Sequence, residues 1–221
     1  MLPTRIIAVR HGETAWNVDT RIQGQLDIGL NEKGQWQAER VGRALADETF
    51  ARVYASDLMR AHHTALAIAR HNKPLQERAE HEREVHLHAG LRERGFGKFE
   101  GHTYAAIEAQ WPDESRRWRQ REPDFAPEGG ETPVQVMERV DRTVTELASR
   151  HSGEQIVLVA HGGIMDMLYR LATRQTVSAP RTWELGNTAI NRLLWTPEGL
   201  TLVGWSDTRH LDETALDEFG T

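Results

Sequence analysis

Short apolar runs alternate along the chain with segments whose apolar residues recur at helical spacing. Residues 6–9 (IIAV) and 156–160 (IVLVA) are continuous apolar runs of strand length, and residues 52–55 (RVYA) form a third, less regular run. The helical pattern covers four segments, 31–47, 58–69, 132–150 and 164–171. Strands that alternate with helices in this way predict an α/β fold, in which helices cover both faces of a largely parallel sheet.

Capping residues predict where several of these helices begin. Asn31 and Asp57 each precede a helical pattern and are residue types whose side chains accept hydrogen bonds from the first amides of a helix. Thr132 is followed by Pro133 and by Gln135 three positions on, which is the pattern of a capping box with proline at the first helical position. Each helix is therefore expected to begin within a residue of these positions.

The remaining segments give weaker signals. Residues 76–94 are dense in charge, with a short strand expected near 85–88, and a helix is predicted from about 103 to 111. The stretch from Pro112 to Gly130 reads as an inserted loop, whereas 188–195 and 200–205 predict a terminal pair of strands. We expect a single domain over 1–221, with an inserted lid-like segment at about 102–130 and a mobile acidic tail from about 212.

Composition narrows the class of protein. Lys and Arg total 27 against 33 for Asp and Glu, and the resulting net charge of -6 argues against nucleic acid as the main partner. The chain has no cysteine, which excludes disulfides, thiolate metal sites and a cysteine nucleophile. Neither a secretory signal nor an apolar run of membrane-spanning length is present, so we expect a soluble, cytoplasmic protein without membrane contact.

Two histidines follow apolar strands in the same way. His11 and His161, 150 positions apart (161 minus 11), each end a predicted strand and precede a glycine. Ligands bind at the carboxyl ends of strands in open parallel sheets, and glycine allows backbone amides to approach a bound anion. One such histidine is most simply a loop residue, but two in the same position indicate a site. Because the net charge is negative, an anion site here requires a local cluster of cations, for which Arg10 and Arg60 are candidates.

A metal site is the alternative that the other histidines suggest. His86 and His88 alternate as strand residues on one face would, with His81 nearby, and histidine pairs on strands can bind zinc. In a segment so rich in Glu and Arg, a solvated surface is the preferred interpretation, and no metal is expected.

Residues 10–17 (RHGETAWN) resemble, almost letter for letter, the signature of the histidine phosphatase (phosphoglycerate mutase-like) superfamily. The similarity continues across nearly the whole chain, in QG at 23–24, LNEKG at 30–34, SDLMRA at 56–61, FG at 96–97, FEG at 99–101, PEGGET at 127–132 and HGG at 161–163. It is weakest over 76–89 and 111–125. The resemblance implies a three-layer αβα sandwich whose central sheet is mostly parallel with an antiparallel strand.

The resemblance also implies roles for individual residues. His11 would be the nucleophile that is transiently phosphorylated, and Glu93 would donate a proton to the leaving oxygen. Arg10, Arg60 and His161 would bind the phosphoryl group, and His161, if protonated, would add a third cation to a cluster that can replace a metal ion. Further phosphate or substrate contacts would be Asn17, Gln23, Gly24 and Gly162.

The resemblance leaves the reaction open. Residues 93–97 (ERGFG) and 207–211 (DTRHL) look more like the phosphatase branch, which predicts hydrolysis of a small phosphorylated metabolite with inorganic phosphate as product and no cofactor. The alternative is a phosphoglycerate mutase, in which 2,3-bisphosphoglycerate would serve as primer and Arg116 with Arg117 would bind the substrate carboxylate. A non-catalytic phosphate-recognising regulatory protein is the second alternative. The sequence does not distinguish a monomer from a homodimer.

Overall fold

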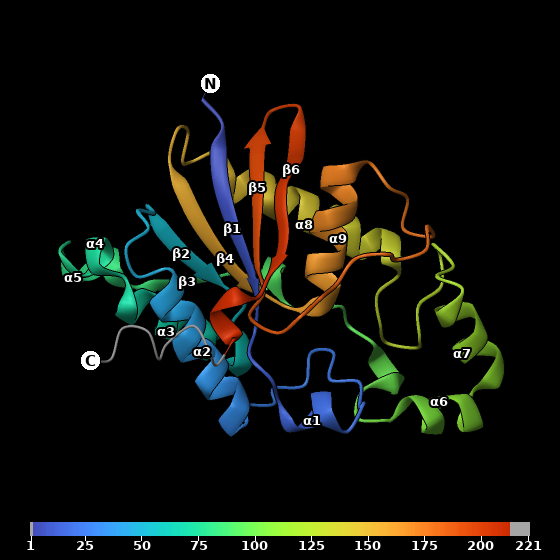
Figure 1. Ribbon diagram of the computed structural model, residues 1–221. Helices are drawn as coiled ribbons and strands as arrows, with labels where there is room; N and C mark the ends of the chain where they lie inside the picture. The colour runs from blue at the N-terminus through green and yellow to red at the C-terminus, as the bar shows by residue number, and fades with distance from the viewer. Residues whose placement is uncertain (1, 213–221) are drawn as a thin grey trace.

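The computed structural model describes residues 2–212, which fold around one six-stranded sheet (Figure 1). The strand order is β3-β2-β4-β1-β5-β6. The strands are β1 (Thr4–Arg10), β2 (Arg52–Ala55), β3 (Val85–Leu87), β4 (Gln155–Ala160), β5 (Ile190–Thr196) and β6 (Gly199–Asp207). Parallel pairing joins β3, β2, β4 and β1, whereas β5 runs antiparallel to both of its neighbours. The predicted mostly parallel sheet with an antiparallel strand is therefore confirmed.

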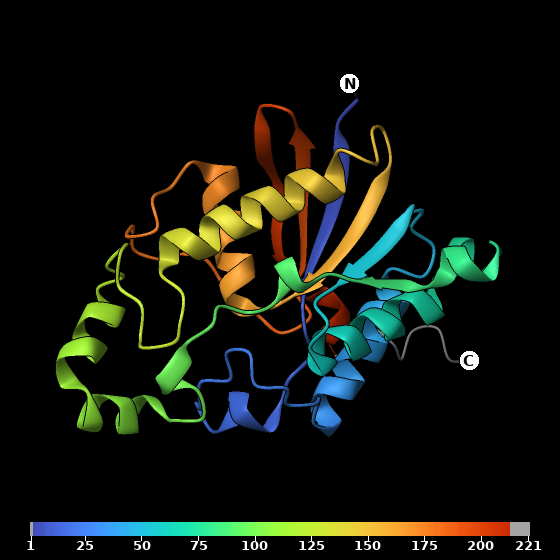
Figure 2. The ribbon, with the colours of Figure 1, turned by 180° about the vertical axis from the view of Figure 1, so that it is seen from behind.

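Helices cover both faces of this sheet. The longer helices are α2 (Glu32–Ala44), α3 (Met59–His71), α8 (Pro133–Ala148) and α9 (Gly162–Thr173). The shorter ones are α1 (Ala15–Val18), α4 (Lys73–Gln76), α5 (Glu80–Arg83), α6 (Tyr104–Gln110), α7 (Pro112–Arg119) and the 3-10 turns η1 (Ala89–Leu91), η2 (Gly97–Phe99) and η3 (Arg209–Leu211). Figure 2 shows α8 crossing one face of the sheet, while α2 and α3 lie beside the other face. The three layers are those of the predicted αβα sandwich.

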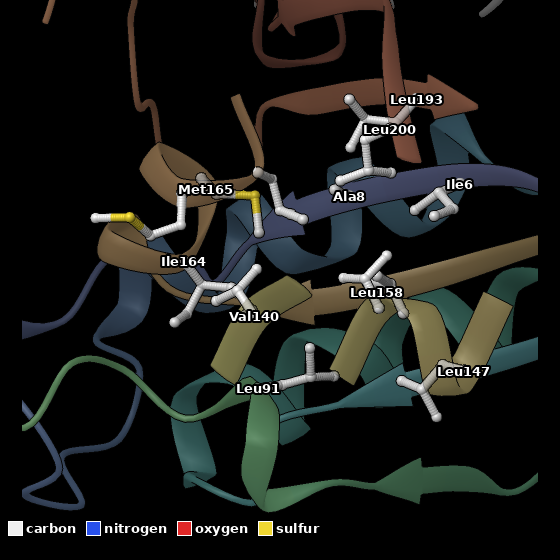
Figure 3. Close-up of a cluster of buried hydrophobic side chains, with 14 of the residues drawn as sticks. Ile6, Ala8, Leu91, Val140, Leu147, Leu158, Ile164, Met165, Leu193 and Leu200 are labelled. Atoms are coloured by element: carbon white, nitrogen blue, oxygen red, sulfur yellow. The ribbon is translucent and has the colours of Figure 1, made fainter. Parts of the chain in front are cut away.

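The central strands read as continuous apolar runs because both of their faces are buried. On β1, Ile6 and Ala8 join the core under α8 and α9, whereas Ile7 and Val9 join the core under α2 and α3. Figure 3 shows the first of these cores, in which α8 and α9 contribute the labelled side chains Val140, Leu147, Ile164 and Met165. At about 25 cal/mol per Å² of apolar surface removed from water, this two-sided burial is the main stabilising contribution to the sheet.

Two of the three predicted caps are confirmed. Asn31 accepts a hydrogen bond from the amide of Gly34, and Thr132 forms a complete capping box with Gln135. The prediction for Asp57 is wrong, because the N-cap of α3 is Leu58 and has no side-chain hydrogen bond.

Asp57 instead pairs with an arginine far away in the sequence. Its carboxylate accepts two hydrogen bonds from Arg92, at 2.7 Å from Nε and 2.6 Å from Nη2. A bidentate pairing with a guanidinium is stronger than one hydrogen bond to a helix amide, so the carboxylate turns away from the helix. The pairing ties the end of β2 to the segment that carries Glu93.

The stretch predicted to be an inserted loop contains a helix. Pro112 starts α7 at its first helical position, where proline is tolerated because the first amides of a helix have no partner inside it. Helices α6 and α7 pack on a separate apolar cluster that includes Phe99, Ile107, Trp111 and Trp118. In Figure 1 these helices lie beyond the carboxyl ends of the strands, beside the pocket described below.

The weaker predictions at the sheet edges are confirmed, because β3 covers 85–87 and β5 and β6 form the terminal pair. The chain is still anchored at Asp212, whose carbonyl accepts a hydrogen bond of 2.7 Å from Arg40. The tail predicted to be mobile from about 212 otherwise lies outside the described residues. Over 2–212, no helix combines the length and the apolar character needed to cross a membrane.

Replacing Gly34 by alanine is expected to destabilise the protein, although the same change stabilises an open helix by about 1 kcal/mol. A Cβ atom at Gly34 would lie 2.0 Å from the carbonyl oxygen of Glu13, in the loop that follows His11. Such overpacking against backbone lowers the free energy of unfolding by about 1–3 kcal/mol, which corresponds to a decrease of several degrees in Tm. Thermal unfolding checks this, with Gly204→Ala as control because a Cβ there meets no atom within 4 Å. A Tm for Gly34→Ala equal to or above that of the unmodified chain would contradict the packing argument.

Candidate active site

A pocket of about 800 Å³ lies at the carboxyl ends of the parallel strands. His11 follows β1 and His161 follows β4, and these two strands are adjacent with Arg10 opposite Ala160. The two imidazole rings consequently lie 5.2 Å apart between centroids. Arg60, in the first turn of α3 after β2, and Glu93, in the loop after η1, also reach this end of the sheet. Four adjacent strands thus bring together the five residues predicted from motifs: Arg10, His11, Arg60, Glu93 and His161.

The backbone around His11 determines which ring nitrogen faces the pocket. Its Nδ1 lies 2.7 Å from the carbonyl oxygen of Gly12, so Nδ1 carries the proton and donates to that oxygen. Nε2 is left with its lone pair. Burial, and then the positive charges of Arg10 and Arg60, lower the pKa of His11 well below its ordinary value. The ring is therefore neutral at neutral pH, as a nucleophile must be.

The two arginines beside His11 are held by carbonyl oxygens rather than by carboxylates. Arg60, which is 1% exposed, donates from Nη1 to Leu26 at 2.8 Å and from Nη2 to Gly24 at 2.7 Å. Arg10 donates from Nη1 to the carbonyl of Leu185. Burial lowers the pKa of both, yet a guanidinium keeps its charge at neutral pH. Because neutral carbonyls fix them, both retain their positive charge for an anion in the pocket.

His161 is fully buried and is the N-cap of α9, where its side chain forms no capping hydrogen bond. Burial, followed by the charges of Arg60, His11 and Arg10, lowers its pKa well below the ordinary value. The third cation, expected only if His161 is protonated, therefore stays a prediction for the state in which an anion occupies the pocket. A neutral imidazole still supplies one N–H donor.

The carboxylate of Glu93 is fixed by two backbone amides. Oε1 accepts from the amide of Arg94 at 2.8 Å, and Oε2 accepts from the amide of Gly163 at 3.0 Å. A Cβ at Gly163 would lie 2.3 Å from Glu93 Oε1, so this glycine is what lets α9 approach the carboxylate. Arg139, which belongs to none of the sequence motifs, holds the same loop by donating to the carbonyls of Gly90 and Arg92, each at 2.9 Å.

The residues predicted as further contacts also line the pocket, but several of their polar atoms already have partners. Asn17 accepts from the amide of Thr14 at 3.0 Å as part of the capping box of α1. Gln23 accepts from the hydroxyl of Thr14 at 3.0 Å. Gly24, at a φ of 52°, offers its carbonyl to Arg60. Gly162 lies in the first turn of α9, where a Cβ would be 3.4 Å from Arg10 Nε.

Five further cations, here called the outer cations, line the pocket without having been indicated by any sequence motif: Arg21, Arg94, Arg119, Arg121 and Arg181. They come from separate loops and helix ends, and no local motif distinguishes them from other arginines. Arg116 and Arg117, which the mutase alternative requires for binding the substrate carboxylate, form ion pairs with acidic side chains of the chain itself. A nitrogen of Arg116 lies 3.1 Å from a carboxylate oxygen of Asp113, and Arg117 lies 2.6 Å from Glu122.

The histidines considered for zinc lie away from the pocket. The ring of His86 packs 5.7 Å from that of Tyr54, and His88 Nδ1 accepts from the amide of Gly90 at 3.0 Å. Within residues 2–212, no three His, Asp or Glu side chains gather in a way that could hold a metal ion.

Comparisons with known proteins show which family the chain belongs to. The chain matches the model of the histidine phosphatase superfamily (branch 1) over residues 6–208. It is 35% identical over 218 residues to phosphoglycerate mutase-like protein 4 of Arabidopsis thaliana, covering 97% of this chain and 90% of that protein. It is 32% identical over 219 residues to a metal-independent phosphoserine phosphatase of the same organism, covering 98% and 87%.

A solved structure is similar over nearly the same length. A mutant of the phosphoserine phosphatase of Entamoeba histolytica, in complex with phosphoserine, superposes with a TM-score of 0.81 at 27% identity, covering 95% of this chain and 100% of that one. The chain belongs to the histidine phosphatase superfamily.

Proposed function

We propose that this chain is a phosphomonoesterase that hydrolyses a small phosphate ester through a phosphohistidine intermediate on His11. The observation that carries the proposal is a set of unpartnered polar atoms around His11. Among the described residues, Arg10 Nε, Arg60 Nε and both ring nitrogens of His161 are buried without a hydrogen-bond partner. A buried polar group left unpaired costs about 1–3 kcal/mol, so such groups normally have partners. A phosphoryl group beside His11 Nε2 would supply acceptor oxygens to all three side chains.

The proposed reaction has two steps. In the first, a bond forms between His11 Nε2 and phosphorus while the bond from phosphorus to the ester oxygen breaks, and Glu93 gives its proton to that oxygen. In the second, water attacks phosphorus, the bond to Nε2 breaks, and Glu93 accepts a proton from the water. Arg10 and Arg60 stabilise the charge on the equatorial oxygens in both steps. The products are an alcohol and inorganic phosphate.

A mutase is the second candidate, favoured by the similarity to phosphoglycerate mutase-like protein 4. It would return the phosphoryl group from His11 to an acceptor hydroxyl rather than to water. The acidic partners of Arg116 and Arg117 count against the carboxylate site on which this alternative depended. A regulatory protein without turnover would keep the cation cluster but would not require a neutral nucleophile or a fixed carboxyl group.

We also propose that the segment 102–130 covers the bound substrate. Tyr104, Trp118 and Arg119 from this segment line the pocket, and Tyr104 remains 52% exposed. Excluding bulk water from one side of the pocket would strengthen the electrostatic contacts with the phosphoryl group.

The test is hydrolysis of p-nitrophenyl phosphate and a panel of small phosphate esters in the presence of EDTA. Release of inorganic phosphate at the same rate with and without EDTA is expected, because arginines take the place of a metal ion. Loss of activity on chelation would overturn the metal-free mechanism. Absence of hydrolysis, together with phosphoryl exchange between phosphoglycerates primed by 2,3-bisphosphoglycerate, would establish the mutase instead.

A further inference from the structure

The carbonyl that fixes the tautomer of His11 belongs to a peptide group that is also held at its other end. The carbonyl oxygen of Gly12 faces His11 Nδ1, and the N–H of the same peptide group belongs to Glu13. This N–H donates to Gln37 Oε1, on α2, at 2.8 Å. Because the C=O and N–H of a trans peptide point in opposite directions, the two hydrogen bonds together fix the plane of the group. Hydrogen bonds in such a chain also polarise one another, which strengthens the contact with Nδ1.

The preceding peptide group, between His11 and Gly12, is held in the same way. Its carbonyl accepts from Asn187 Nδ2 at 2.8 Å, and its N–H donates to Thr64 Oγ1 at 3.1 Å. The single hydroxyl hydrogen of Thr64 is donated to the carbonyl of Arg60 at 2.8 Å, so its oxygen acts as an acceptor towards Gly12. Thr64 therefore ties the backbone beside His11 to the turn of α3 that carries Arg60.

Two of these side chains are buried where α2 and α3 pack against the loop. Gln37 is 6% exposed and Thr64 is 0% exposed. Gly34 and Gln37 are three residues apart and share a face of α2, and Gly34 is the position at which a Cβ would collide with the carbonyl of Glu13. The helix thus comes close enough for Gln37 to reach the loop. Removing either buried acceptor would leave a loop amide without its partner, and the loop would shift to find another.

We propose that Gln37, Thr64 and Asn187, here called the clamp residues, are positioning residues for the nucleophile. They hold the two peptide groups beside Gly12 so that its carbonyl keeps the proton of His11 on Nδ1 and leaves the lone pair on Nε2. None of the three lines the pocket, so they act through His11 and not on the substrate. The inference rests on the proposed function, in which Nε2 attacks phosphorus. A tautomer that carries the proton on Nε2 has no lone pair there and cannot attack.

The first measurement is the ¹⁵N spectrum of the histidine rings near neutral pH, in which the two tautomers give different signals. The signals of His11 are identified by their absence from the spectrum of His11→Ala. We expect the unmodified protein to show one tautomer of His11, with the proton on Nδ1. A proton on Nε2 in the unmodified protein would overturn the proposal.

The second measurement compares Thr64→Val, which removes the hydroxyl, with Gln37→Met, which removes the amide. In each variant we expect kcat for p-nitrophenyl phosphate to fall by about 10- to 100-fold while KM stays within about twofold, because the substrate contacts are untouched. The second tautomer of His11 should appear in the ¹⁵N spectrum of both. Thr64→Ser keeps the acceptor oxygen and should recover most of the lost kcat.

The matched control is Thr173→Val, near the end of α9 and outside this pocket. Thr173 is half-buried, and its hydroxyl donates at 2.7 Å to the carbonyl of Tyr169, four residues earlier. Thr64 makes the same kind of helical hydrogen bond to Arg60. The control therefore loses an equivalent bond without a contact to the loop of His11, and it should keep both kcat and the tautomer.

Failure of the clamp and failure of the proposed function give different results. If folded Thr64→Val and Gln37→Met match Thr173→Val in kcat and keep the single tautomer, the clamp is refuted while the phosphatase stands. If these helix variants do not fold, Asn187→Ala, in a half-buried loop position, is subject to the same expectations. If the unmodified protein hydrolyses no ester, the proposed function fails and the ¹⁵N spectra decide alone. A second tautomer of His11 in the variants would then support the clamp, and one unchanged tautomer would refute it.

Discussion

Replacing His11 by alanine is expected to reduce kcat for aryl and alkyl phosphates alike, by about 10⁴-fold or more. The reason is that Nε2 of His11 is the atom that bonds to phosphorus in both steps, and no other nucleophile is proposed to replace it. The measurement is steady-state hydrolysis, combined with a ³²P-labelled substrate to detect phosphate bound to the quenched protein. We expect an acid-labile phosphoprotein in the unmodified chain and none in the variant.

The control for this experiment is His63→Ala, an exposed histidine on α3 that lies outside the pocket. It should retain full activity, and both variants should give the circular dichroism spectrum of the unmodified protein. Substantial hydrolysis by a folded His11→Ala variant would mean that water attacks the ester directly. The cation cluster would then be a binding site with a different catalytic group, and the phosphohistidine mechanism would be wrong.

Replacing Glu93 by glutamine is expected to affect substrates according to their leaving groups. Alkyl phosphates should lose about 10²–10⁴-fold in kcat/KM, because an alkoxide leaves poorly unless it is protonated. p-Nitrophenyl phosphate should lose less than about tenfold, since p-nitrophenolate is stable enough to leave without a proton. The measurement is kcat/KM for a series of esters graded by the pKa of the leaving alcohol.

Glu138→Gln provides the matched control, as an exposed carboxylate on α8 outside this pocket. A steep dependence on the pKa of the leaving alcohol should appear in Glu93→Gln and not in the control. An equal loss for all esters in Glu93→Gln would assign Glu93 to positioning rather than to proton transfer. The carboxylate of Glu93 accepts hydrogen bonds from the amides of Arg94 and Gly163. That outcome would therefore mean that Glu93 acts by holding the start of α9 in place through Gly163.

The elements of the sheet could be predicted because their signals are local or depend on burial on both faces. The runs at 6–9 and 156–160 are apolar at every position, which occurs where helices cover both sides of a strand. The side chains of Asn31 and Thr132 each accept a hydrogen bond from the amide three residues later, so these helix caps can be predicted from the sequence alone. The motif histidines lie together for a related reason, since each ends a parallel strand and such ends share one edge of the sheet.

Where the local interpretation failed, a distant residue provided a stronger partner. Asp57 was expected to cap α3, but Arg92 offers it two hydrogen bonds, at 2.7 and 2.6 Å. The sequence predicts a loop from Pro112 onward, yet this proline begins α7, which is stabilised by packing on Trp111 and Phe99 of a separate apolar cluster. Neither the ion pair nor the cluster is visible in a window of neighbouring residues.

The sequence by itself therefore determined the αβα fold, the family and the five motif residues that lie together at the carboxyl ends of the parallel strands. Tertiary structure decided the properties that depend on surroundings. Burial, together with the charges of Arg60, His11 and Arg10, lowers the pKa of His161, and none of these causes depends on its neighbours in sequence. The outer cations belong to the pocket because separate loops and helix ends bring them there. Desolvation and hydrogen-bond geometry act through space, so these features emerge only when the chain is folded.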